Sequence, residues 1–515
     1  MNLIKAIIGL VLVVCLIFAL RTGEKKSVNQ KEKQNGEKQN KETLKVYCAV
    51  GIKIPFEKTV EEFEKLYSVD ISSEFKGSGH LMGSVKLNPI GDLFIAADSS
   101  YTTSLKKDGL IKETLPLAEM HPVIIVQKGN PKNIKSLADF KREDIKIILA
   151  NPESASIGNV TKKILEAKGD WEAVSANATK NGVFKPTVTE IANDIKMKVM
   201  DAAIIWDAIA KQKNYISDFD IIEVDELKTN KETVTVGILT ASKNPSLALK
   251  FARFLHAKDK GQKHFEAESF TAIQNADTWE DHPTITLYSG GVNRRAIEKT
   301  ILEFQEREGV TINTSYNGCG ILVGQMKAGG KPDAYFACDT SFMTQVNSRF
   351  DKPEVLSQTN IVLVVKKGNP LNIKNLEDLA KPGIRLGVGH PEQAALGTLT
   401  KKLLDASGLY EKIKPNISVE SPSADMIIAQ FKTGSLDACL VYTVNVSYMK
   451  DEVELIELKD EKSKATQPFG IANYTNNHYL LERFLEAIKN NHNRFTEAGF
   501  NYLGSKNSNE PVGLK

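Results

Sequence analysis

The sequence predicts an α/β protein of two tandem domains, each with two lobes, after an N-terminal hydrophobic helix. The chain has 515 residues, too many for one ordinary domain. It repeats itself over most of its length, and each repeat alternates short apolar β-rich runs with helical patterns. An apolar content of 41% is typical of a protein with folded cores.

The repeat consists of matching segments whose sequence offset drifts slowly. The pairs are 128–131 with 367–370 at offset 239, 77–79 with 318–320 at 241, 201–202 with 437–438 at 236, and 253–255 with 483–485 at 230. Because the order is kept while the offset changes, we infer a duplicated domain with a few loop deletions. We place the copies at 44–276 and 284–505, joined near 277–283.

Within each copy, β-rich runs are separated by helical patterns. The expected strands are 44–50, 92–97, 123–127, 145–150 and 202–206 in the first copy, and 284–289, 333–337, 361–366, 384–388 and 438–442 in the second. Such apolar strands predict parallel sheets covered by helices on both faces. In these sheets ligands bind at the carboxyl ends of strands, beside helix N-termini. The lobes of the first copy are expected at 44–122 with 235–276, and at 123–234.

The N-terminus is typical of an export signal. Lys5 precedes an apolar run that ends at Arg21, so residues 1–21 are expected to be a signal peptide or a signal anchor. No small-residue cleavage pattern follows, and Cys15 lies in only a loose lipoprotein-like box, which favours the anchor. Residues 22–43 contain one Val and no other aliphatic or aromatic residue. We expect them to form a disordered tether to an extracytoplasmic body.

Charge and cysteines exclude several functions. Residues 1–43 contribute +4 to the formal net charge of +3, which leaves −1 on the remainder and no basic surface for nucleic acid. The five cysteines form no CxxC pair, which argues against a disulfide scaffold or a zinc ribbon. Cys319 and Cys338 can come close in the fold, but small buried cysteines are the simpler interpretation.

The sequence contains no HExxH, GxSxG, Walker or dinucleotide motif, so we expect neither an enzyme nor a bound cofactor or metal. Small residues do recur where strands should lead into helices. These junctions are 47–51, 77–79 and 152–158, with counterparts at 288–291, 318–320 and 391–397. Backbone N–H groups at helix starts suit an anion, although Gly and Ser also serve in the tight turns of any α/β domain.

The order of these segments resembles the molybdate/tungstate-binding proteins of ABC importers, which have the type II periplasmic-binding-protein fold. The resemblance covers nearly all of residues 44–505. In that family two serine hydroxyls, backbone amides and a tyrosine hydroxyl hold the oxyanion. By position, the resemblance implies ligand-binding residues at Gly51, Ser78, Ile157, Val188 and Trp206 in the first copy, and at Val292, Cys319, Leu396, Ala424 and Tyr442 in the second.

Neither copy keeps the family's full set of ligand residues. Gly51 and Val292 replace the first serine, Cys319 replaces the second serine in one copy, and Trp206 replaces the tyrosine in the other. Two domains therefore need not mean two equal sites. The basic residues Lys53, Arg294 and Arg295 can add charge near the sites or remain ordinary solvated helix starts. Glu153 and Glu392 are interpreted as helix-start residues.

The leading hypothesis is capture of a small tetrahedral oxyanion, molybdate or tungstate, by closure of two lobes, and its delivery to an ABC permease in the membrane. A fully deprotonated dianion offers only hydrogen-bond acceptors, so its host should offer only donors. Three alternatives remain: a membrane-tethered ligand sensor of the same fold, a binder of another small anion or metal, and an enzyme on this fold.

Overall fold

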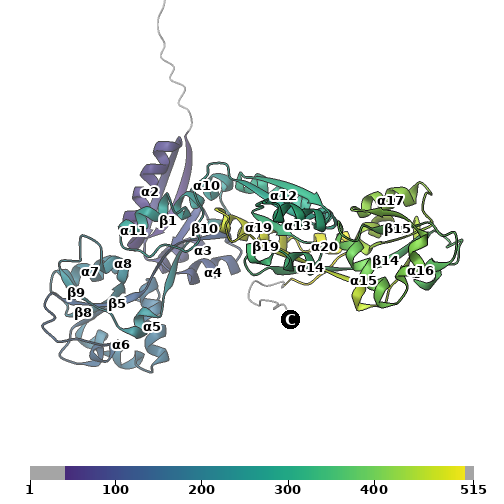
Figure 1. The fold of residues 1–515 in the computed structure, drawn as a ribbon. Helices are drawn as coiled ribbons and strands as arrows, with labels where there is room; N and C mark the ends of the chain where they lie inside the picture. The colour runs from purple at the N-terminus through teal and green to yellow at the C-terminus, as the bar shows by residue number, and fades with distance from the viewer. Residues whose placement is uncertain (1–40, 450, 505–515) are drawn as a thin grey trace, which may run out of the picture. The chain divides into compact units, whose positions relative to one another are not determined.

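The computed structural model describes residues 41–449 and 451–504 (Figure 1). The expected signal or anchor at 1–21 lies outside these residues, as does the expected tether up to residue 40. Among the described helices, none has the length and apolar character needed to cross a membrane.

The first lobe of the first domain is built on a five-stranded sheet. Its strands, in spatial order, are β2 (Val69–Lys76), β1 (Glu42–Ala49), β3 (Leu93–Ala96), β10 (Glu232–Leu239) and β4 (Ile111–Met120). Its helices are α2 (Lys53–Leu66), α3 (Ser78–Leu87), α4 (Ser99–Lys107), α10 (Pro245–His256) and α11 (Gly261–Ala267). Strand side chains alternate between two apolar clusters: Ile95 lies in one and Phe94 in the other. The sheet is therefore covered on both faces.

The second lobe of the first domain has its own five-stranded sheet. Its strands, in spatial order, are β7 (Val183–Lys185), β6 (Ile147–Ala150), β8 (Ala202–Trp206), β5 (Pro122–Gln127) and β9 (Phe219–Ile222). Its helices are α5 (Ser156–Ala167), α6 (Trp171–Asn181), α7 (Val188–Lys196), α8 (Asp207–Ala210) and α9 (Asp225–Lys228). The chain enters this lobe after β4 and leaves it before β10, as expected from the sequence.

The second domain repeats this plan in one larger sheet. Its strand order is β12 (Thr311–Asn317), β11 (Thr284–Gly290), β13 (Ala334–Phe336), β19 (Lys464–Ile471), β14 (Glu354–Lys366), β17 (Ala438–Tyr442), β15 (Leu386–Gly389) and β16 (Ile417–Ser421), while β18 (Val453–Glu457) and β20 (Asn501–Tyr502) also pair with β14. Its helices are α12 (Arg294–Glu308), α13 (Cys319–Lys327), α14 (Thr340–Thr344), α15 (Ala395–Ala406), α16 (Tyr410–Ile413), α17 (Ala424–Lys432), α18 (Thr443–Val446), α19 (His478–Asn490) and α20 (Asn493–Ala498). Strand β14 runs through both lobes, whereas the first domain has β4 and β5 in its place.

The expectation of purely parallel sheets is wrong. Strand β1 pairs in parallel with β3, but β10 runs antiparallel to β3 and β4, and β5 runs antiparallel to β8 and β9. The reason is topological. The chain crosses between lobes and returns, so the crossing strands join each sheet in the reverse direction.

The segment between the domains is held by Asp277. Its carboxylate accepts hydrogen bonds from the N–H groups of Tyr479 and Leu480, at 2.8 and 3.0 Å. These are the second and third residues of α19, so Asp277 caps a helix through residues that lie 202 and 203 positions away in sequence. The Asp277 N–H donates to Nε2 of the buried His256, whose Nδ1 donates to the Pro116 carbonyl.

Candidate functional site

A small pocket lies between the two lobes of the first domain, with a volume of about 30 Å³. It has room for a group of only a few atoms. Its lining is largely apolar: Ala49, Val50, Gly51, Ile52, Gly77, Ser78, Ala97, Met120, Ala155, Ser156, Ile157, Thr187, Val188, Trp206 and Ile209. No carboxylate and no cationic side chain is among these residues.

Three helices begin at this pocket. Ser78, Ser156 and Val188 are the first residues of α3, α5 and α7. Helix starts present backbone N–H groups without intrahelical partners and the positive end of the helix dipole. The sequence produces this convergence through its strand-to-helix junctions, which lie at facing edges of the two sheets. The pocket therefore offers donors to an anion.

Glycines allow the two lobes to approach each other here. The N–H of Gly79 donates to the carbonyl of Ser154 in the other lobe at 3.1 Å. A methyl group on Gly77 or Gly79 would collide with backbone oxygens of that lobe. The second domain makes the same contact, because the N–H of Gly320 donates to the Gln393 carbonyl, also at 3.1 Å. Both domains are thus closed by the same backbone hydrogen bond.

Side chains add a second link between the lobes in the first domain. The hydroxyl of Ser156 donates to the carboxylate of Asp98. Asp98 also caps α4 by accepting from the Ser100 N–H at 2.9 Å. Burial, together with the charge of Asp98, raises the pKa of Glu232 to about 7. The ionisation of Glu232 is therefore coupled to the charge of Asp98, which accepts the hydrogen bond from Ser156.

Ser78 is buried against the end of β3. Its Oγ accepts a hydrogen bond from the Ala97 N–H at 3.2 Å, which leaves the hydroxyl hydrogen available to a ligand. Trp206 ends β8 and is only 2% exposed.

The second domain has a larger and more polar pocket in the corresponding place, with a volume of about 220 Å³. Its lining residues are Gly291, Val292, Arg294, Tyr316, Asn317, Gly318, Cys338, Ala394, Ala395, Leu396, Pro422, Ser423, Ala424, Asp425, Tyr442 and Asn445. A cation, a carboxylate and two phenols are present here, unlike in the first pocket.

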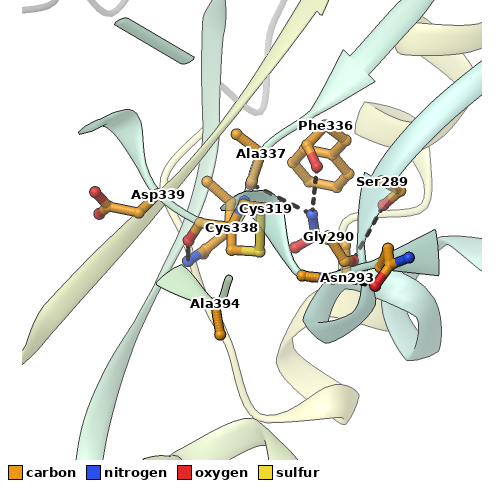
Figure 2. The surroundings of a disulfide bond; sticks show 12 residues. Ser289, Gly290, Asn293, Cys319, Phe336, Ala337, Cys338, Asp339 and Ala394 are labelled. Atoms are coloured by element: carbon orange, nitrogen blue, oxygen red, sulfur yellow. Dashed lines mark hydrogen bonds between the residues drawn. A yellow bond between two sulfur atoms is a disulfide. The ribbon is translucent and has the colours of Figure 1, made fainter. Parts of the chain in front are cut away.

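A disulfide bond joins Cys319 and Cys338 (Figure 2), and Cys338 lines this pocket. The interpretation of all five cysteines as small buried thiols is therefore wrong for this pair, although Cys48 and Cys439 are free and buried. At the same repeat offset, Ser78 and Ala97 of the first domain correspond to the two bonded cysteines. The sulfur of Cys319 accepts from the Cys338 N–H at 3.0 Å, as the Ser78 oxygen does from Ala97.

Gly290 makes room for the disulfide. Its counterpart in the first domain is Ala49, and a methyl group at Gly290 would collide with the Cys338 sulfur. Figure 2 shows Gly290 beside the bond, with Asn293 donating to the backbone oxygens of Phe336 and Ala337 at 3.0 and 3.3 Å. The position of Gly290 and the positions of the two bonded cysteines thus all differ between the domains.

Nine of the ten expected ligand residues line the two pockets. In the first domain these are Gly51, Ser78, Ile157, Val188 and Trp206, and in the second Val292, Leu396, Ala424 and Tyr442. Cys319 does not line its pocket, because its sulfur is bonded to Cys338, which does. Whether these residues bind ligand stays a prediction.

The basic residues near the junctions differ in whether they line a pocket. Arg294 lines the second pocket, 2.8 Å from Glu298 and over the Tyr316 ring. Lys53, its counterpart, is absent from the first pocket's lining and lies 3.6 Å from Glu57. The guanidinium carbon of Arg295 lies 3.9 Å from the centre of the Tyr448 ring.

Glu153 and Glu392 line neither pocket. Within the described parts of the chain, no cluster of His, Cys, Asp or Glu has the makings of a metal site.

Sequence reasoning missed Ser156, Ile209, Tyr316, Asp425 and Asn445, all pocket residues. The repeat itself contained a signal for the last of these, because the offset of 236 that pairs Trp206 with Tyr442 also pairs Ile209 with Asn445.

Comparison with known proteins gives matches to each half separately. The family model described as bacterial extracellular solute-binding protein matches residues 44–271 and 285–501. The molybdate-binding protein ModA of Mycobacterium bovis is 23% identical over 224 residues, which are 43% of this chain and 82% of that protein. The sulfate-binding protein of Synechococcus elongatus is 28% identical over 210 residues, or 35% of this chain and 57% of that protein.

Among solved structures, the periplasmic molybdate-binding protein of Azotobacter vinelandii aligns with 45% of this chain and 100% of its own, at 14% identity and a TM-score of 0.38. Each of these three relatives thus spans less than half of the present chain.

Proposed function

Because the chain belongs to the bacterial extracellular solute-binding proteins, whose family model matches both of its halves, we propose that it captures small oxyanions outside the cytoplasm for an ABC importer. In this proposal the first domain binds a tetrahedral dianion, molybdate or tungstate. The permease in the membrane is its partner, residues 1–21 anchor it and residues 22–43 tether it. The chain acts by binding and closure, without covalent chemistry.

The lining of the first pocket supports this proposal best. Three helix starts and the Ser78 hydroxyl supply donors, and the lining residues include no carboxylate. A fully deprotonated dianion can accept from every donor, whereas a protonated phosphate would find no carboxylate among the lining residues to accept its own hydrogen. The small volume favours an inorganic anion over an organic one.

Thermal denaturation of the full-length protein tests the proposal. Molybdate and tungstate should raise the melting temperature in proportion to the logarithm of their concentration, more strongly than sulfate or phosphate does. Ser78→Ala should weaken this effect. The control is Ser154→Ala, whose hydroxyl bonds the Asn151 carbonyl and lies outside the pocket lining. No stabilisation by any of the four anions would refute the proposal.

A further inference from the structure

The pocket of the second domain has side chains that a bare oxyanion cannot satisfy. We propose that it binds a small organic acid that carries a hydroxyl or ammonium group beside its anionic group. This inference rests on the proposal that the chain captures solutes, and it assigns the second domain a different ligand class from the first.

Several polar atoms of the residues that line this pocket have no hydrogen-bond partner in the described structure. Tyr442 and Asn445 are 3% and 8% exposed, and both line it. The Tyr442 hydroxyl and the Asn445 carboxamide oxygen are buried, and neither has a hydrogen-bond partner within the described structure. The Tyr316 hydroxyl is in the same situation. Buried polar groups without partners are costly, so a ligand that pairs with them gains binding energy.

The pocket residues include both hydrogen-bond donors and acceptors. Burial raises the pKa of Tyr442 well above its usual range and that of Tyr316 to about 12, so both phenols remain protonated and can donate. The Asn445 carboxamide contributes an acceptor as well as a donor. Asp425, at the start of α17, adds a carboxylate to the lining. A ligand for this pocket must therefore bring hydrogen-bond donors of its own.

The pocket lining also includes a positive charge. The guanidinium of Arg294 lies 5.3 Å from the centre of the Tyr316 ring. Arginine binds carboxylates through parallel hydrogen bonds. The starts of α13, α15 and α17, at Cys319, Ala395 and Ala424, face the same space with their N–H groups. The pocket thus offers a cation and N–H groups to the anionic part of a ligand, and Asp425 and Asn445 to its donor group.

The two pockets also differ in the side chains at matching positions. Both domains are closed by the same backbone hydrogen bond of 3.1 Å, from Gly79 and from Gly320. The larger volume of the second pocket accompanies smaller or more polar residues at matching positions: Trp206 against Tyr442, Ile209 against Asn445, and Val188 against Ala424. An organic molecule of several atoms fits the second volume and exceeds the first.

Isothermal calorimetry on the full-length protein tests the inference with matched acids. Lactate is compared with propionate, malate with succinate, and serine is added as the ammonium acid. We expect a hydroxy or amino acid to bind at one site, at least about tenfold more tightly than its analogue without the donor. Asn445→Ile, which installs the residue of the first domain, should remove most of this preference.

Two further variants distinguish a loss of ligand contacts from misfolding or an indirect effect. Tyr442→Phe removes only a hydroxyl and should weaken acid binding. Thr443→Ala is the control on the same short helix, since its hydroxyl bonds the Asn360 carbonyl and is not part of the pocket lining, and it should bind like the unmodified protein.

Molybdate titrations of the same samples separate this inference from the proposed function. If molybdate binds at one site and no acid of the panel binds at millimolar concentration, the inference alone is overturned. A second molybdate site that Asn445→Ile removes would also overturn it. If neither anions nor acids bind, the proposed function fails as well.

Discussion

The hydroxyl of Ser156, in the second lobe of the first domain, donates a hydrogen bond to the carboxylate of Asp98 in the first lobe. The second domain lacks this link, because Ala395 occupies the place of Ser156 and its Asp339 accepts from the Thr466 N–H instead. Two domains of one fold therefore hold their lobes together by different sets of contacts.

Ser156→Ala should weaken ligand binding in the first domain. A hydrogen bond to a charged group contributes about 1.5–3 kcal/mol, so we expect affinity to fall by roughly tenfold or more. Calorimetry with molybdate measures the change. Ser100→Ala is the matched control, since its hydroxyl bonds the same carboxylate without crossing between lobes. An equal loss in both variants would contradict a role in closure.

Glu232→Gln should make the protein more stable at pH 8 than the unmodified chain, and equally stable at pH 4. The pKa of Glu232 is raised from 4.5 to about 7, so its contribution to stability is complete below pH 4.5 and is lost as the pH rises through 7. Thermal denaturation at several pH values measures this difference.

The pH experiment has an internal control in Glu226, whose pKa is lowered by its hydrogen bond from Lys168. Glu226→Gln should bring no gain at pH 8. A stability difference for Glu232→Gln that does not grow between pH 4.5 and 7 would contradict the prediction.

Gly290→Ala should destabilise the second domain by about 1–3 kcal/mol, because the added methyl group collides with the Cys338 sulfur. The same substitution should cost far less in a Cys319→Ser, Cys338→Ala background, which recreates the Ala49, Ser78 and Ala97 arrangement of the first domain. Denaturant unfolding of four proteins forms a mutant cycle: the unmodified chain, the glycine variant, the variant with both cysteines replaced, and the variant with all three changes.

The cycle also isolates the disulfide. Its loop spans a sequence separation of 19, for which loop closure alone predicts a loss of about 3 kcal/mol when the bond is removed. Additive effects of the glycine and cysteine changes would show that the three positions are independent.

Asp277→Ala should destabilise the chain by about 1 kcal/mol through loss of the cap on α19. Asn477→Ala is the control, since Asn477 precedes the helix but makes no capping hydrogen bond with its side chain. Thermal denaturation measures both variants. A larger loss of stability in Asp277→Ala than in Asn477→Ala supports the assignment, and a larger loss in Asn477→Ala would contradict it.

Much of this fold is predictable from the sequence because apolar strands and an internal sequence repeat leave strong patterns. Strand β8 at Ala202–Trp206 and strand β17 at Ala438–Tyr442 have the expected bounds. The direction of β10 was not predictable, because local periodicity says nothing about which neighbour a returning strand meets. Most of the expected pocket positions line the pockets of both domains, since the strand-to-helix junctions fix where the helices start.

The chemistry of the second site was harder to predict. Cysteine spacing alone does not reveal that Cys319 and Cys338 are adjacent in space, although the coordinated change of Ala49 to Gly290 was a readable sign. The link from Ser156 to Asp98 depends on lobe closure, which no local pattern encodes.

The disulfide has a consequence for where the second domain matures. Disulfides form in oxidising compartments and are rare where glutathione keeps thiols reduced. In newly made chains that are still in the cytoplasm, Cys319 and Cys338 would be free thiols. The disulfide beside the second pocket would form only after export. Recombinant protein made in a reducing host should therefore be oxidised before its ligands are sought.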